Sequence, residues 1–220
     1  MENPWLDIPA SEYEAHMSLP EVAQAQALSS LMAAVLKQYE PDSIAVIGCS
    51  TGNGFEHIDI GCTRRVVGLD INPLYLERLR ARYEERIPGL ELIGADVATP
   101  GFRIAPVSMA FAGLIFEYVN VKRALSNIER SLIPGGLLLA VLQERCAEET
   151  PVTATKYESL ARLAPFMRLV PPGEFSRACE NLGLRTIKTD QMPLKRGKAF
   201  FIGLYQKECA ASAGDVGMSG

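Results

Sequence analysis

The chain has few of the residues from which proteins build metal sites or disulfide frameworks. Its 220 residues include two histidines and five cysteines. The cysteines are odd in number, widely spread and contain no C-x-x-C pair, which argues against a zinc site and against a secreted disulfide framework. A histidine-rich metal site is excluded as well, so we expect no metal. Reduced thiols are typical of the cytoplasm, and we therefore expect a cytoplasmic protein.

An excess of basic residues and a long apolar run are also missing. The 22 Lys and Arg residues against 26 Asp and Glu residues give a net charge of −4, whereas nucleic-acid-binding proteins concentrate positive charge. No uninterrupted apolar stretch reaches the roughly 18 residues that a membrane helix needs. The start, MENPWLDIPA, lacks the basic region and apolar core of a signal peptide. We expect a soluble chain with neither nucleic acid nor membrane as partner.

What the sequence does contain is an alternation of short apolar runs with helical segments. Helices are predicted from the Asn72-Pro73 start to Pro88-Gly89, and from Asn120 to Pro134. The apolar runs favour buried strands at Ile44–Ile47, Val66–Leu69, Leu90–Ile93, Val107–Phe116 and Leu137–Leu142. Such alternation predicts an α/β domain with a mainly parallel sheet.

Both ends of the chain depart from this alternation. Residues 1–40 predict two covering helices, Ser11–Met17 and another from Ser18, each opened by an S-x-x-E capping box. The long connection 144–172 is a candidate lid. After it we expect a helix at Gly173–Leu182 and an antiparallel hairpin of two strands, Leu184–Met192 and Ala199–Tyr205. The small and polar residues 208–220 are expected to form a disordered tail.

Candidate ligand-binding residues follow the first three predicted strands. The first strand leads into GCSTGNG, where Gly48, Gly52 and Gly54 permit a tight turn before a helix start with free N–H groups. Asp70 ends the second strand, 22 positions after Gly48, and Asp96 follows the third. In nucleotide-binding α/β folds, a carboxylate about 20 residues after the first glycine accepts hydrogen bonds from ribose hydroxyls. Asp96 has the alternative role of a turn residue or helix cap.

In this order, IGCSTGNG, GLDINP, GADV and IPGGLLLAV resemble the motifs of class I S-adenosylmethionine-dependent methyltransferases, over about Ser43 to Leu142. The resemblance implies a three-layer Rossmann-like sandwich over residues 1–207, with a seven-stranded, mostly parallel sheet, a C-terminal antiparallel hairpin and an N-terminal helical cover. It implies S-adenosylmethionine as cofactor and S-adenosylhomocysteine as product. The chain differs from the family at Val46, where an acidic residue is frequent, and at Ser50, where glycine is frequent.

The residues that match these motifs are expected to bind the cofactor. By the resemblance, the glycine loop lies along the methionine moiety, Asp70 holds the ribose hydroxyls, and Asp96 flanks the adenine. The expected contacts are Gly48, Cys49, Ser50, Gly52, Asp70, Ile71, Asp96, Val97 and Phe116.

The methyl acceptor leaves a weaker signal, because the cofactor carries the reactive group and the protein mainly aligns the two partners. The segment LIFEYVN lacks the strings typical of nucleic-acid methyltransferases, which favours a small molecule. His16, Glu117 and Tyr118 are the catalytic or orienting candidates, although a structural role suits each of them as well. The expected substrate wall comprises Tyr13, Met17, Tyr157 and Phe166.

Two other functions fit part of the pattern. The spacing of the three loop glycines also occurs in short-chain dehydrogenases that bind a nicotinamide dinucleotide. Their Tyr-x-x-x-Lys pair is matched in spacing by Tyr118 and Lys122, but this pair directly follows the fourth strand. A cofactor-binding sensor or partner module without catalysis is the second alternative, because Val46 replaces the acidic residue and no clear catalytic group is evident. The main prediction is a small-molecule methyltransferase that acts as a monomer or homodimer.

Overall fold

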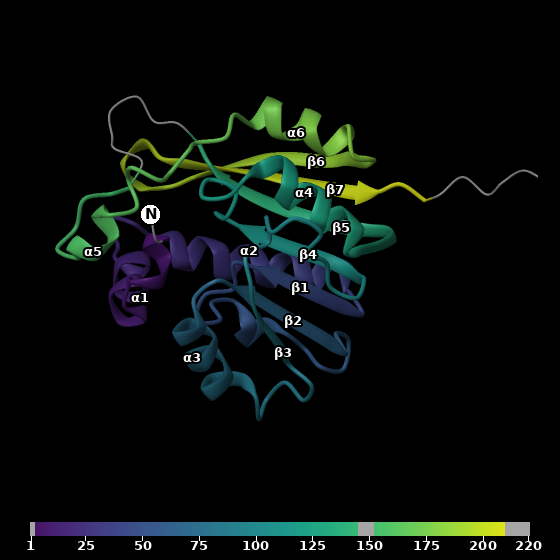
Figure 1. The fold of residues 1–220 in the computed structure, drawn as a ribbon, viewed down its shortest axis with the longest axis horizontal. Coiled ribbons are helices and arrows are strands. Elements are labelled where there is room, and N and C mark those ends of the chain that lie inside the picture. The colour runs from purple at the N-terminus through teal and green to yellow at the C-terminus, as the bar shows by residue number, and fades with distance from the viewer. Residues whose placement is uncertain (1–2, 145–151, 210–220) are drawn as a thin grey trace, which may run out of the picture.

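A seven-stranded sheet forms the middle layer of the computed structural model, which describes residues 3–144 and 152–209 (Figure 1). The strand order is β3-β2-β1-β4-β5-β7-β6. Strands β1 to β5 run parallel, and β7 runs antiparallel to both β5 and β6. The strands are β1 (Ser43–Ile47), β2 (Arg65–Asp70), β3 (Glu91–Gly94), β4 (Val107–Gly113), β5 (Leu132–Gln143), β6 (Leu184–Pro193) and β7 (Ala199–Lys207). The expected mostly parallel sheet with a C-terminal antiparallel hairpin is confirmed.

Helices cover both faces of this sheet and complete the three layers. Alternate strand residues point to opposite faces, so Val46 packs in one apolar cluster with α2 and α3, and Ile47 packs in another with α4 and α6. The helices are α1 (Ala10–Ser18), α2 (Gln24–Tyr39), α3 (Pro73–Tyr83), α4 (Val121–Arg130), α5 (Glu158–Ala161) and α6 (Pro172–Glu180). Within the described ranges, no helix is both long and apolar enough to cross a membrane.

The predicted capping boxes of the first two helices are wrong. Helix α1 begins at Ala10 after Pro9, and α2 begins at Gln24 after Ala23, whose φ is 51°. The physical reason at α1 is that the Glu14 carboxylate bonds to distant residues instead of capping its own helix. Before α2, the N–H groups of residues 22 and 23 both donate to the Leu19 carbonyl, which makes a turn.

The glycine loop is followed by one 3-10 turn, η2 (Phe55–His57), and not by the predicted helix. The N–H groups of Gly48 and Cys49 both donate to the Leu69 carbonyl, at 2.8 and 3.0 Å. The loop amides are therefore used to fix the loop against the end of β2. The free helical N–H groups expected here as an anion site do not form.

The boundaries of two other strands also differ from prediction. Strand β4 ends at Gly113, before the expected Phe116, and β5 begins at Leu132, before the expected Leu137. Of the predicted tail, residues 210–220 lie outside the described residues, as do residues 145–151 of the candidate lid.

The N-terminal segment lies at the carboxyl end of the parallel strands, where α1 and α5 stand together (Figure 1). Glu14 of α1 accepts hydrogen bonds from Thr51 in the glycine loop and from Arg82 in α3, and it pairs with Arg78 at 3.0 Å. Burial alone would raise the pKa of Glu14, but the hydrogen bonds from Arg82 and Thr51 outweigh it and lower the pKa. The carboxylate thus ties the cover to two elements of the sheet layer.

We predict that Glu14→Gln lowers the free energy of unfolding by about 1 kcal/mol near neutral pH, because the ion pairs are partly exposed and screened. The lowered pKa means that Glu14 stabilises the fold above its unfolded-state pKa, and that this stability disappears as pH falls through the folded-state pKa. Urea unfolding at pH 7 and pH 3 measures both effects. Glu84→Gln, which removes an exposed pair with Arg80, is the control. A Glu14 loss no larger than the Glu84 loss at pH 7 contradicts the prediction.

Candidate functional site

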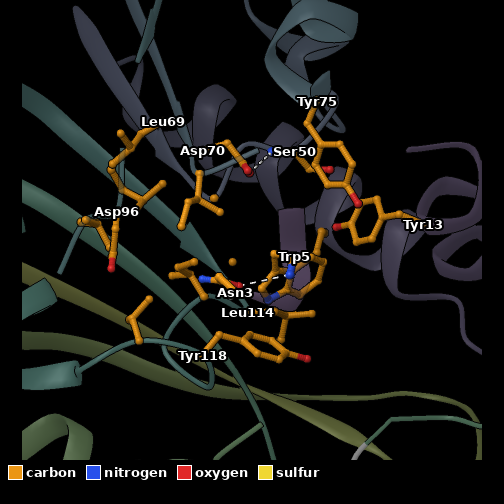
Figure 2. A pocket seen from close by; sticks show the side chains of 18 of the residues that line it. Asn3, Trp5, Tyr13, Ser50, Leu69, Asp70, Tyr75, Asp96, Leu114 and Tyr118 are labelled. Atoms are coloured by element: carbon orange, nitrogen blue, oxygen red, sulfur yellow. Dashed lines mark hydrogen bonds between the residues drawn. The ribbon is translucent and has the colours of Figure 1, made fainter. Parts of the chain in front are cut away.

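A cavity lies at the carboxyl end of the parallel strands, beneath the N-terminal segment (Figure 2). Loops that follow β1, β2, β3 and β4 line it on one side, and Asn3, Trp5 and Tyr13 line it on the other. Six of the nine expected cofactor residues line it: Gly48, Ser50, Asp70, Ile71, Asp96 and Val97. The sequence motifs therefore converge on one cavity.

Asp70 is held in a fixed orientation at this cavity. Its Oδ2 accepts a hydrogen bond from the Ser50 N–H at 2.8 Å, and its Oδ1 accepts one from the Asn72 N–H at 2.9 Å. Burial raises the pKa of Asp70, and the N–H groups of Asn72 and Ser50 oppose that rise. Because each carboxylate oxygen can accept more than one hydrogen bond, Asp70 keeps acceptor capacity for a ligand hydroxyl.

The Asp96 carboxylate lies on the side of the cavity away from Tyr13 (Figure 2). Its Oδ1 accepts a hydrogen bond from the Ala98 N–H at 2.7 Å, so it also caps its own turn, as the alternative interpretation held. Asn127 of α4 donates to the Val97 carbonyl at 2.7 Å and fixes the neighbouring backbone. Apolar side chains of Ile71 and Val97 also line the cavity. Flat, partly apolar ligands suit such a surface.

Tyr75 Oη is buried at this cavity without a hydrogen-bond partner, and Ser50 Oγ is buried beside the Tyr13 phenol, whose pKa a hydrogen bond from Ser50 lowers against the effect of burial. Ser50 adopts φ 48°, a left-handed conformation that costs a non-glycine residue about 1 kcal/mol. A glycine would relieve that strain, and the loop amides are already used, so the Ser50 hydroxyl is the group that the strained conformation presents. Among the described residues that line the cavity, none is Lys, Arg or His. Its polar side chains are hydroxyls, three amides and two carboxylates, which suits a polyhydroxylated, cationic ligand such as S-adenosylmethionine.

Three expected cofactor residues lie outside this lining and have packing roles. Gly52 has φ 93°, and a Cβ atom there would stand 2.8 Å from the Tyr83 ring. Cys49 is buried against Gly68 of β2. The Phe116 ring packs edge-on against Phe175, with ring centroids 4.6 Å apart. These packing contacts account for the three residues at their positions without a bound ligand. That Gly52, Cys49 and Phe116 contact the cofactor stays a prediction.

A second, smaller cavity adjoins the first under α1. His16 lines it, and its Nδ1 lies 3.0 Å from the Thr155 hydroxyl. Burial lowers the pKa of His16, and the charge of Lys198 lowers it further. Tyr118 lines both cavities, and burial raises its pKa, so its phenol stays neutral. The seven residues common to the two linings are Trp5, Tyr13, Met17, Gln24, Tyr118, Gln143 and Met167.

The expected substrate residues divide between this junction and positions away from it. Tyr13 and Met17 line both cavities. Tyr157 packs against the apolar cluster of Ile8, and Phe166 is 38% exposed, so neither lines a cavity. The other histidine, His57, lies on η2 beside the Ser29 hydroxyl, which agrees with a structural role.

Glu117 is buried but lines neither cavity. Its Oε1 accepts a hydrogen bond from the Gln143 N–H at 2.7 Å, and its backbone carbonyl accepts one from the Arg168 N–H at 2.8 Å. Burial raises the pKa of Glu117 to about 7, and the N–H of Gln143 opposes that rise. The residue therefore joins three segments behind the junction of the two cavities, which is a positioning role.

Sequence reasoning missed the parts of the wall that Asn3, Gln24 and Tyr75 supply. Trp5 stands between Tyr13 and Tyr118, edge-on to both, with ring centroids 5.8 and 5.0 Å apart. Asn3 and Gln24 reach the cavity from this side, and Tyr75 reaches it from α3. None of these belongs to a motif. The one available signal for Tyr75 was its position directly after the Asn72-Pro73 helix start, close to Asp70 in sequence.

The comparisons with known proteins agree with this geometry. A family model described as a methyltransferase domain matches residues 45–140. No curated protein sequence matches the chain. Among solved structures, the chain is similar to the N-methyltransferase NodS from Bradyrhizobium japonicum WM9, in complex with S-adenosyl-L-homocysteine, with a TM-score of 0.67 and 13% identity over 94% of this chain and 99% of that one.

Two further neighbours share the fold but carry different descriptions. Geranyl diphosphate C-methyltransferase from Streptomyces coelicolor A3(2) gives a TM-score of 0.62 at 15% identity, over 84% of this chain and 83% of that one. The [4+2]-cyclase SpnF gives a TM-score of 0.67 at 13% identity, over 84% and 83%. At such identities the likeness shows the fold alone. The Rossmann-like architecture expected from the sequence is confirmed.

The dinucleotide alternative loses support at the glycine loop. Dinucleotide-binding folds place a pyrophosphate on the N–H groups of a helix that follows the loop. Here the loop is followed by a three-residue 3-10 turn, and its first amides bond to Leu69 and Asp70. Lys122 of the Tyr-x-x-x-Lys spacing is exposed on α4 and lines neither cavity.

We predict that Glu117→Gln stabilises the protein at alkaline pH. Glutamine keeps an oxygen that accepts from the Gln143 N–H. A folded-state pKa of about 7 lies above the unfolded value of 4.5. The Glu117 carboxyl of wild type therefore contributes fully to the free energy of unfolding below pH 4.5, and this contribution is lost as pH rises through 7. The free energy of unfolding of the variant should exceed that of wild type by roughly 2–3 kcal/mol at pH 8 and differ little from it at pH 4. Chemical unfolding across that range measures it. A constant difference at all pH values contradicts the assignment.

Proposed function

We propose that this chain is a class I S-adenosylmethionine-dependent methyltransferase that methylates a small molecule held in the second cavity; the family model over residues 45–140 and the fold support this proposal. The observation that carries this proposal is the common wall of seven residues, because a cofactor in the first cavity then meets an acceptor in the second. When bound, the cofactor supplies an electrophilic methyl group. The chain itself has to bind both molecules, orient the acceptor toward the methyl group and remove the acceptor's proton.

In the first cavity, each polar group has a complementary part of the cofactor. Asp70 accepts hydrogen bonds from ribose hydroxyls, and Asp96 accepts from the adenine amino group. The Ser50 and Tyr75 hydroxyls would donate to oxygen atoms of the cofactor, which would satisfy the Tyr75 hydroxyl, a buried group that is otherwise unpaired. Val46 is buried in the apolar cluster of α2 and α3, so it takes no part in the contact that an acidic residue makes in other family members.

In the second cavity, His16 is the proposed general base. Its lowered pKa keeps the imidazole neutral at physiological pH, and Thr155 orients the ring. Tyr13, Met17 and Tyr118 lie at the junction and would align the acceptor with the methyl group. Glu117, with its bond to the Gln143 N–H, would hold the wall of this junction in place.

We further propose that residues 1–207 act as one cytoplasmic domain, as a monomer or homodimer, with residues 1–40 as its cover and without nucleic acid as partner. The resemblance to a [4+2]-cyclase means that this fold also occurs in a protein named for another reaction. A sensor that binds the cofactor without turnover is the competing function. Calorimetry with S-adenosylhomocysteine, followed by an assay of labelled methyl transfer to a panel of phenols, carboxylic acids and amines, separates the two. Absence of cofactor binding overturns the proposal.

Ser50→Gly tests the cofactor site without loss of the fold. We predict a Kd for S-adenosylhomocysteine about fivefold higher, because one hydrogen bond worth about 1 kcal/mol is lost. The free energy of unfolding should equal or exceed that of wild type, because glycine relieves the left-handed strain. The control is Glu40→Gly, which replaces another left-handed residue, at the end of α2 and away from the cavity. It should gain stability with unchanged affinity. Equal affinities of the two variants would refute the role of Ser50.

His16→Gln tests the base. We predict that the kcat of methyl transfer falls by about 10²-fold or more, while the Kd for S-adenosylhomocysteine stays within twofold. In wild type, the acidic limb of the kcat profile should lie below pH 6.5, because burial lowers the pKa of His16. His57→Gln is the matched control, since it removes the chain's other histidine outside both cavities. Retention of full kcat in His16→Gln would show that another group, or none, removes the proton.

A further inference from the structure

Three aromatic rings stand together in the wall that the two cavities share. Trp5 lies between Tyr13 and Tyr118, with ring centroids 5.8 and 5.0 Å apart, and the planes of the two tyrosines make angles of 74° and 86° with the indole (Figure 2). Rings at near right angles can turn their faces toward one common point. Aromatic cages of this kind bind quaternary ammonium ligands, because the face of an aromatic ring carries partial negative charge.

The electrostatic surroundings of these rings also favour a cation. Burial raises the pKa of Tyr13 to about 12 and raises the pKa of Tyr118 as well, so both phenols stay neutral at pH 7. The charges of Asp70 and Glu14 add to the rise at Tyr13, which means that the negative potential of these carboxylates reaches the ring. A cation beside the rings would therefore be attracted by the ring faces and by the carboxylates together.

The proposed function brings a positive charge to the same wall. In that proposal Asp96 and Asp70 bind the adenine and the ribose, and the methyl group faces the second cavity. The sulfur atom that carries the methyl group would then lie at the wall that both cavities share. Before transfer this sulfur is a cationic sulfonium, and afterwards it is a neutral thioether, which a ring face attracts far less.

We infer that Trp5, Tyr13 and Tyr118 form an aromatic cage for the sulfonium, through which the chain binds the cofactor more tightly than its product. This inference rests on the proposed function. It assigns to the N-terminal segment a role in the choice between the two ligands, so that the product gives way to fresh cofactor. The effect is large enough to measure, since one ring face at a desolvated site raises affinity for a cation roughly two- to thirtyfold.

The experiment compares three ligands of similar shape by calorimetry with the full chain at pH 7. S-adenosylmethionine carries the sulfonium, and S-adenosylhomocysteine carries the neutral thioether. Sinefungin carries a protonated amine near the position of the methyl group. We expect wild type to bind both cationic ligands at least tenfold more tightly than S-adenosylhomocysteine.

Matched variants separate the ring from the rest of the side chain. Tyr118→Leu removes the ring and should lower both affinity ratios at least threefold, whereas Tyr118→Phe keeps the ring and should keep both ratios within twofold of wild type. Trp5→Leu removes a second ring and should act as Tyr118→Leu does. Tyr39→Leu, at the end of α2 and outside both cavities, should keep the wild-type ratios. Thermal unfolding checks the fold of each variant, and if one leucine variant fails to fold, the other still decides.

Equal binding of cations and thioether by wild type, or tighter binding of the thioether, would overturn the inference. A preference for S-adenosylmethionine that sinefungin does not share would also overturn it, because the wall would then recognise the methyl group and not the charge. Ratios that survive the loss of either ring would assign the preference to the carboxylates alone. If none of the three ligands binds, the proposed function is refuted, whereas binding without preference refutes this inference alone.

Discussion

The Asp70 carboxylate is the point at which the parts of the site are joined. One oxygen accepts from the Ser50 N–H of the glycine loop and the other from the Asn72 N–H that opens α3. Asn72 then donates from its side chain to the Trp5 carbonyl at 2.8 Å, so the N-terminal segment is connected to the same carboxylate through one residue. Loop, helix and cover are consequently positioned relative to a single charged group. Removal of that charge would disturb all three, which makes Asp70 structural and ligand-binding at once.

The glycine loop divides two tasks between neighbouring residues. Ser50 presents its hydroxyl to the cavity in a strained conformation, and Thr51 donates its hydroxyl to Glu14 of the cover. A shift of the loop backbone therefore affects the cavity and the cover together. The energetic scale of both effects is modest, about 1 kcal/mol each.

Local patterns were sufficient for the sheet and for half of the site. The strands that hold Asp70 and Asp96 are short apolar runs with a polar residue at the end, and the parallel topology brings those ends together. The Asn72-Pro73 start of α3 is likewise a local signal. The sequence does not show that no helix follows the glycine loop, because this depends on hydrogen bonds from the loop amides to the Leu69 carbonyl of a neighbouring strand. Glu14 was assigned to a cap for the same reason, since its real partners lie 37 and 68 residues away. The position of the N-terminal cover over the cavity is set by tertiary contacts. The sequence therefore gave no signal that Asn3 and Gln24 line the cavity or that Glu117 is buried behind it.

Trp5 is the chain's single tryptophan, and it stands at the junction of the two cavities with its carbonyl bonded to Asn72. Its indole touches two tyrosines edge-on and belongs to the N-terminal segment that lines the first cavity. All tryptophan emission of the protein therefore originates at this one point. The molecule therefore carries its own optical reporter, because a ligand that fills either cavity changes the surroundings of this indole and can be followed by intrinsic fluorescence without an added label.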